Sequence, residues 1–110
     1  MATNVYKILG QSAPSATTDT DVYTVPSATE SVISTIIIAN RGASAGTFRV
    51  ALRPDGAAIA ATHYIAFDVP VAATDSTTLS LGITLDAADV VTVQCSSADM
   101  TVSIFGTEIS

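Results

Sequence analysis

Hydrophobic and polar residues alternate with a period of two along most of the chain. Residues 47–53 show this most clearly, because Phe48, Val50 and Leu52 alternate with small or basic residues. Successive side chains of a β-strand point to opposite faces, so the pattern predicts a strand with one buried face. Residues 32–40 carry isoleucine on both faces, which indicates a central strand or one covered by another subunit. Residues 41–46 are rich in small residues, and we therefore expect 31–40 and 47–53 to form a hairpin.

Similar alternation recurs in further segments that are separated by turn-forming residues. These segments are 5–9, 21–25, 63–71, 77–83, 91–95 and 100–104. In 63–71 we expect Ile65, Phe67 and Val69 to point inward, and Tyr64 and Asp68 to point outward. Strands that recur every ~8–12 residues are typical of a sandwich or barrel. The sequence therefore predicts one all-β domain over residues 1–110, an antiparallel β-sandwich of about eight strands with jelly-roll or immunoglobulin-like topology.

Composition narrows the class of function. Hydrophobic residues make up 48% of the chain, which excludes intrinsic disorder, while charged residues make up only 13%. The net charge is -6 with four basic residues, which argues against nucleic acid as a partner, because phosphate binding needs clustered Lys and Arg. The longest apolar runs fall far short of the ~20 residues of a membrane span, and no stretch suits a signal peptide. We expect a protein made in a cytoplasm, with no membrane partner.

Residues suited to catalysis or metal binding are sparse. His63 is the one histidine, and the sequence has no nucleophile elbow, Walker loop or dinucleotide-binding motif, so we expect neither an enzyme nor a cofactor. Aspartates in the predicted loops match no calcium-loop spacing, and we expect solvated turn residues and no metal. Cys95 is alone and shares an inward face with Val91 and Val93, where a free cysteine packs as a small hydrophobe.

The predicted outer faces offer the most useful functional signal. They carry mostly Thr, Ser and Ala, so they could pack against another protein without desolvating many charges. Arg49 and Arg53 should share an outward face, about 13 Å apart. They are either anchors on a partner surface, where Arg is favoured, or solvated charges that keep the face soluble. Tyr64 and Tyr23, also predicted on outer faces, complete the set of candidate partner-contact residues.

Six segments carry a family resemblance. They are VYKILGQSAP (5–14), YTVP (23–26), ANRGASAGTFRVALRPDGA (39–57), HYIAFDVPVAA (63–73), LGITLDAADVVTV (81–93) and FGTEI (105–109). Together they resemble small virion structural proteins of tailed bacteriophages, particularly phages of cyanobacteria and marine bacteria. The resemblance implies a non-enzymatic component of the virion, made in the host cytoplasm. It implies other virion structural proteins as partners, with symmetric homo-oligomers or lattice-bound copies, and it brings no catalytic, cofactor or metal residue.

Two functions remain open at this point. The first is a structural subunit that joins, caps or decorates other particle proteins in the head, tail, baseplate or fibre, held by its sheet faces or by strand addition. The alternative is a carbohydrate- or receptor-binding module for the host surface. The chain has no Trp and only three Tyr, which weighs against the alternative, because aromatic stacking usually carries sugar binding.

Overall fold

A computed structural model describes residues 3–110, and strands account for most of them. The elements in chain order are β1 (Asn4–Ser12), β2 (Thr20–Thr24), β3 (Glu30–Asn40), β4 (Gly46–Arg53), the 3-10 turns η1 (Pro54–Gly56) and η2 (Ala61–His63), β5 (Tyr64–Val71), β6 (Ser76–Leu85), β7 (Val90–Cys95) and β8 (Met100–Ile109). The predicted all-β fold is confirmed. Within residues 3–110, no helix is long and apolar enough to cross a membrane.

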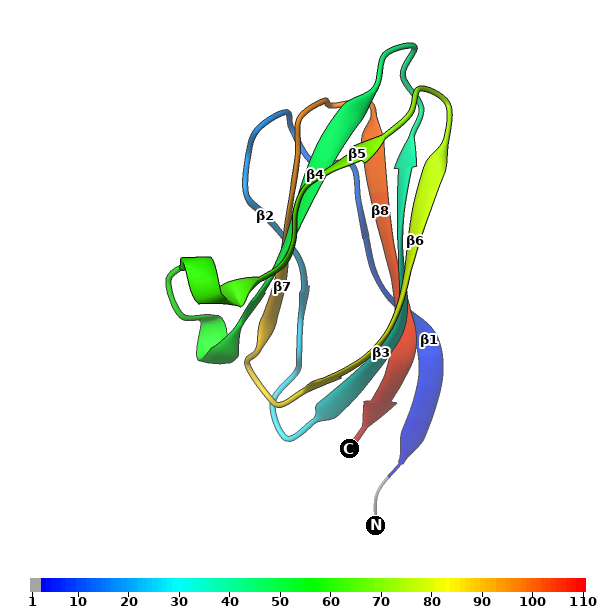
Figure 1. Cartoon of the computed structure of the whole chain (residues 1–110). Coiled ribbons are helices and arrows are strands. Elements are labelled where there is room, and N and C mark those ends of the chain that lie inside the picture. Colours follow the sequence, from blue (N-terminus) through cyan, green and yellow to red (C-terminus); the bar gives the residue numbers. More distant parts are fainter. Residues whose placement is uncertain (1–2) are drawn as a thin grey trace.

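The strands form two antiparallel four-stranded sheets that face each other (Figure 1). One sheet has the order β1-β8-β3-β6 and the other has the order β2-β7-β4-β5. The pairing is nested, because β1 pairs with β8, β2 with β7, β3 with β6 and β4 with β5. This order results when a long pair of antiparallel strands folds over on itself, and it is the strand order of a jelly roll. An immunoglobulin-like sandwich would keep its first two strands in one sheet, whereas β1 and β2 lie in different sheets.

The predicted hairpin of residues 31–40 and 47–53 is wrong. β3 pairs with β6 and β8, and β4 pairs with β5 and β7, so the connection between β3 and β4 crosses from one sheet to the other. Asn40 holds this crossing. Its buried amide donates hydrogen bonds to the carbonyls of Ser44 (2.9 Å) and Val71 (3.3 Å), and its Oδ1 accepts one from the Gly42 amide (2.9 Å). Small residues predict a change of direction, but not the sheet that the next strand joins.

The inner faces of both sheets form one hydrophobic core. A β-bulge at Ser34 shifts the register of β3, and Ile33, Ile36 and Ile38 are consequently all fully buried. Cys95 is also fully buried in this core, and burial raises the pKa of its thiol to about 11. Its predicted inward position is therefore confirmed.

Candidate interaction surfaces

Tyr23 points into the sandwich, contrary to the prediction that it lies on an outer face. Its side chain is only 7% exposed. The hydroxyl donates a hydrogen bond to Oε2 of Glu108 (2.6 Å) and accepts one from Ser31 (2.6 Å). The reason is a register shift in β2 between Asp21 and Tyr23, which interrupts the alternation on which the prediction depended. Tyr23 therefore joins β2 to β3 and β8, and it is not available to a partner.

Glu108 is the centre of this group of polar side chains. Its Oε1 lies 2.7 Å from Nζ of Lys7, while its Oε2 accepts the hydrogen bond from Tyr23. These hydrogen bonds, first from Lys7 and then from Tyr23, hold the pKa of Glu108 below its usual range. Burial, reinforced by the bond to Glu108, raises the pKa of Tyr23 to about 12. The group has the character of a structural link between the two sheets.

Arg53 is committed to its own chain. Its guanidinium donates hydrogen bonds to Thr92 Oγ1 (3.0 Å) and to Asp21 Oδ1 (2.8 Å). It also donates to the carbonyls of Gly56 (3.1 Å) and Ala57 (2.9 Å), which hold η1 against the sheet. Because its donors already have partners, Arg53 is better explained as a brace between β4, β2 and η1 than as an anchor for another protein.

A β-bulge in β5 changes which side chains face outward. Phe48 pairs with Val69 and Val50 pairs with Ala66, so that two residues, Phe67 and Asp68, lie opposite Arg49. Asp68 adopts a φ of 52°, a conformation that Asp tolerates better than most residues. Phe67 is consequently 55% exposed, and the prediction that it points inward is wrong.

The residues next to this bulge follow the same change in register. A second shift, between Val50 and Ala51, leaves Ile65 unpaired with β4 and exposed, so the prediction that it points inward is also wrong. Val69 packs against the core as predicted. Asp68 is exposed, as expected.

Four side chains on β4 and β5 form a connected group, which we call the Arg49 cluster: Arg49, Tyr64, Phe67 and Asp68. The Arg49 guanidinium carbon lies 4.0 Å from the centroid of the Phe67 ring. Nε and Nη2 of Arg49 donate to Oδ1 and Oδ2 of Asp68, at 2.7 and 3.3 Å. The Tyr64 and Phe67 rings pack edge to face with centroids 5.0 Å apart. The cluster therefore presents an exposed aromatic ring whose position is fixed from two sides.

The Arg49 cluster unites two of the four candidate residues, Arg49 and Tyr64, with two that were not predicted to belong there. The hydrogen bond and charge of Arg49 hold the pKa of Asp68 below its usual range, so the pair stays ionised at neutral pH. One sequence signal could have indicated the bulge. Asp68 interrupts a strand of otherwise apolar and aromatic residues, and Asp is favoured where the backbone takes an unusual conformation.

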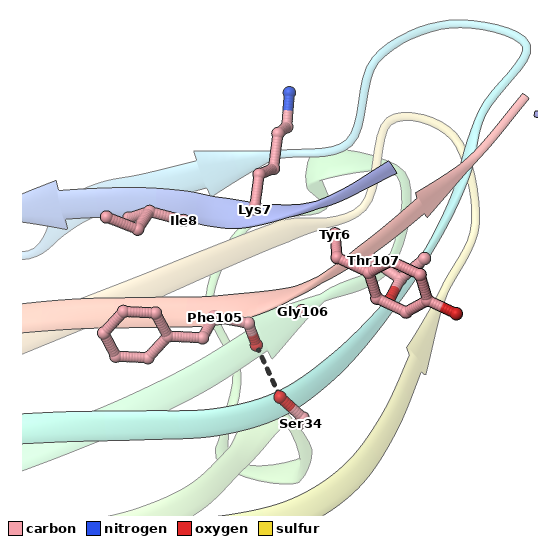
Figure 2. A pocket seen from close by; sticks show the side chains of 7 residues that line it. All are labelled: Tyr6, Lys7, Ile8, Ser34, Phe105, Gly106 and Thr107. Carbon is pink, nitrogen blue, oxygen red and sulfur yellow. Dashed lines mark hydrogen bonds between the residues drawn. The ribbon is translucent and has the colours of Figure 1, made fainter. Parts of the chain in front are cut away.

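A second exposed surface lies on the outer face of the β1–β8 pair (Figure 2). We call it the β1 patch and define it as Tyr6, Ile8 and Phe105. Tyr6 is 81% exposed, and Ile8 lies directly opposite Phe105 in the strand pair. These side chains line an open hollow of about 510 Å³, in which the Ser34 hydroxyl donates to the Phe105 carbonyl (3.2 Å). The sequence analysis did not predict this surface, although Tyr6 and Ile8 are two residues apart and therefore lie on the same face of the strand.

The titratable side chains described above, and His63 as well, take part in contacts that stabilise the fold. Nδ1 of His63 accepts a hydrogen bond from the Ala60 amide (3.1 Å) and thereby caps η2. Over the described range 3–110, no group of three or more His, Cys, Asp or Glu side chains is placed to hold a metal ion.

Neither a family model nor a curated protein matches the chain. Function is therefore inferred from the Arg49 cluster and the β1 patch, together with the resemblance of the six sequence segments.

Proposed function

We propose that the protein is a non-enzymatic structural subunit of a tailed-bacteriophage particle, which joins, caps or decorates other virion proteins. The observation that carries this proposal is the Arg49 cluster, an exposed aromatic ring that the chain itself holds in place. The resemblance of the six segments supplies the phage context. By analogy of fold, jelly rolls also build many viral capsid proteins, as well as lectins.

The Arg49 cluster suits a protein partner for physical reasons. Aromatic residues and Arg are enriched in the centres of protein interfaces, where a few of them provide most of the binding energy. Asp68 already neutralises Arg49, so a partner that covers Phe67 need not bury an unpaired charge. The contacts of Phe67 with Arg49 and Tyr64 restrict its rotamers before binding, which lowers the entropy lost on association.

The proposal is tested by quantitative mass spectrometry of purified particles of the phage that encodes the chain. We expect the protein at a fixed number of copies per particle. We expect Phe67→Ser to lower incorporation at least tenfold, whereas Ile59→Ser, an exposed apolar residue outside the cluster, should leave it unchanged. Circular dichroism of both variants controls for folding. A protein that is abundant in infected cells but absent from purified particles would refute the proposed role.

A second candidate function, recognition of host-surface carbohydrate, is favoured by the hollow beside the β1 patch. Tyr6 and Phe105 line it together with the hydroxyl-bearing residues Ser34 and Thr107, and sugars are bound by combinations of aromatic stacking and hydrogen bonding. Calorimetric titration with host surface polysaccharide distinguishes the two functions. Millimolar or tighter binding that is lost in Tyr6→Ala would support recognition, and no binding would support the architectural role.

A further inference from the structure

The four edge strands of the jelly roll differ in how they are protected against pairing with another chain. β2 has only five residues, and β5 carries two bulges and Pro70. β6 shifts register between Ser80 and Ile83. Short length, bulges and proline are the usual means by which proteins prevent edge-to-edge pairing. β1 has nine residues, and its register against β8 shifts only between Ile8 and Gly10. Its stretch from Asn4 to Ile8, in contrast, pairs with β8 without interruption and contains neither a bulge nor a proline.

β1 also exposes apolar side chains on both of its faces. Tyr6 and Ile8, 81% and 52% exposed, belong to the outer face, and Val5, 45% exposed, belongs to the other. A partner lying above one face would cover only one of these sets. A strand added beside β1 would contact both, because cross-strand neighbours pack side by side on each face of a sheet.

The distribution of charge indicates which strand can approach this edge. The first eighteen residues contain no Asp or Glu, although the whole chain has ten. The single charge in β1, Lys7, is already paired with Glu108. Two copies of a chain with net charge -6 therefore meet with least repulsion at β1.

We propose that β1 pairs antiparallel with β1 of a second copy of this chain, so that two β1-β8-β3-β6 sheets become one sheet of eight strands. Directly opposite residues in such a pair share a face, and a two-fold axis places one residue opposite its own copy. A register centred on Lys7 would place the ammonium groups of the two Lys7 side chains opposite each other. A register centred on Tyr6 instead places Tyr6 against Tyr6 and Lys7 against Val5, and it brings the two β1 patches together. Self-association through β1 is independent of the proposed place in a virion.

Cysteine cross-linking tests this register directly. Native Cys95 is fully buried, so a cysteine introduced at an exposed position is the accessible thiol. Opposite Cα atoms in an antiparallel pair lie about 4.5–5.5 Å apart, within the range that a disulfide spans. Under mild oxidation we expect Tyr6→Cys to form a covalent dimer at least fivefold more than Ile8→Cys or Thr78→Cys, the last on the exposed β6 edge. Equal cross-linking at Tyr6 and Thr78 would overturn the proposal.

Light scattering behind a sizing column provides the second measurement. With rising concentration, the wild-type mass should increase from 11.2 kDa toward twice that value. Tyr6→Lys places two like charges opposite each other and should weaken the association at least tenfold, while Thr78→Lys should not change it. Circular dichroism confirms that both variants fold. A mass that stays monomeric, a Tyr6→Lys variant that still dimerises, or an equal loss in Thr78→Lys, which would indicate β1–β6 pairing, would contradict the inference.

Discussion

Replacing Tyr23 with phenylalanine removes one oxygen atom from the polar link between the two sheets. The hydroxyl donates to the Glu108 carboxylate and accepts from Ser31, both at 2.6 Å. A hydrogen bond to a charged group contributes about 1.5–3 kcal/mol, and a buried hydroxyl left without a partner costs about 1–3 kcal/mol. Ser31 is fully buried and loses its partner in the variant. Both effects belong to one hydrogen-bond network and do not add in full, so we expect Tyr23→Phe to lower the free energy of unfolding by about 2–4 kcal/mol at pH 7.

The same hydroxyl makes the stability depend on alkaline pH. The pKa of Tyr23 is raised from 10.0 to about 12, so the folded protein retains the phenolic proton at pH values where the unfolded chain releases it. The resulting stabilisation is complete below pH 10 and is lost as pH rises through 12. Two pKa units correspond to about 2.7 kcal/mol. By pH 11.5, about 2 kcal/mol of this amount should have disappeared.

Urea unfolding of both proteins between pH 7 and pH 11.5, followed by far-UV circular dichroism, measures both effects. The stability difference between wild type and Tyr23→Phe should be largest at pH 7 and should shrink above pH 10. Every other titratable group is present in both proteins, so its contribution cancels to first order in the difference. Tyr6→Phe, altered at an exposed ring, serves as the control and should match wild type. A difference below 1 kcal/mol at pH 7, or one that does not change with pH, would refute the reasoning.

Three further predictions concern glycine spacing, acid stability and thiol reactivity. Gly106→Ala should destabilise by about 1–3 kcal/mol in urea unfolding, because the added Cβ would collide with the Val32 carbonyl oxygen. At Gly82 an added Cβ would meet no non-neighbouring atom of the described residues within 4 Å, so Gly82→Ala should be neutral or slightly stabilising. An equal loss of stability in the two variants would contradict this account. Because the pKa of Glu108 is lowered, its stabilising effect is present above the unfolded-state pKa of about 4.3 and is lost as pH falls through the folded-state value. Glu108→Gln should therefore be about 1 kcal/mol less stable at pH 7 and show a flatter stability profile between pH 5 and pH 3; parallel profiles would argue against it. Cys95 should react with an aromatic disulfide reagent only at the rate of unfolding, since it is fully buried and its pKa is raised to about 11; rapid labelling of the native protein would show otherwise.

The positions of the strands were predictable because their signal is local. Alternation marks a strand wherever one face is buried, and segments such as 47–53 and 91–95 coincide closely with β4 and β7. The sheet that each strand joins is not a local property. The β3–β4 crossing depends on a hydrogen bond from Asn40 to the carbonyl of Val71, thirty-one residues away, and no feature of residues 41–46 indicates that contact.

The candidate surface was only half predictable, because bulges decide which side chains are exposed. A single inserted residue reverses the inward and outward positions of its neighbours along the strand, which placed Phe67 outside and Tyr23 inside. The contacts that hold these positions are distant in sequence. Asp68 pairs with Arg49 across nineteen residues, and Tyr23 bonds with Glu108 across eighty-five. Outward position and the preference of Arg and Tyr for interfaces predict Arg49 and Tyr64 as separate candidates, whereas their common contact with Phe67 depends on the bulge in β5.

The nested pairing of the strands also sets the order in which the chain can fold. Among the strands of residues 3–110, only β4 and β5 are neighbours in both sequence and sheet. They are separated by residues 54–63, so their pairing closes the smallest loop. The next pair, β3 with β6, encloses β4 and β5, and the pair β2 with β7 encloses all four. Each enclosing pair therefore closes a short loop only after the pair that it encloses has formed. We therefore expect slow refolding that zips outward from β4 and β5. We expect β1 to join last, so the strand that completes each subunit would also be the strand for which we propose pairing with a second copy.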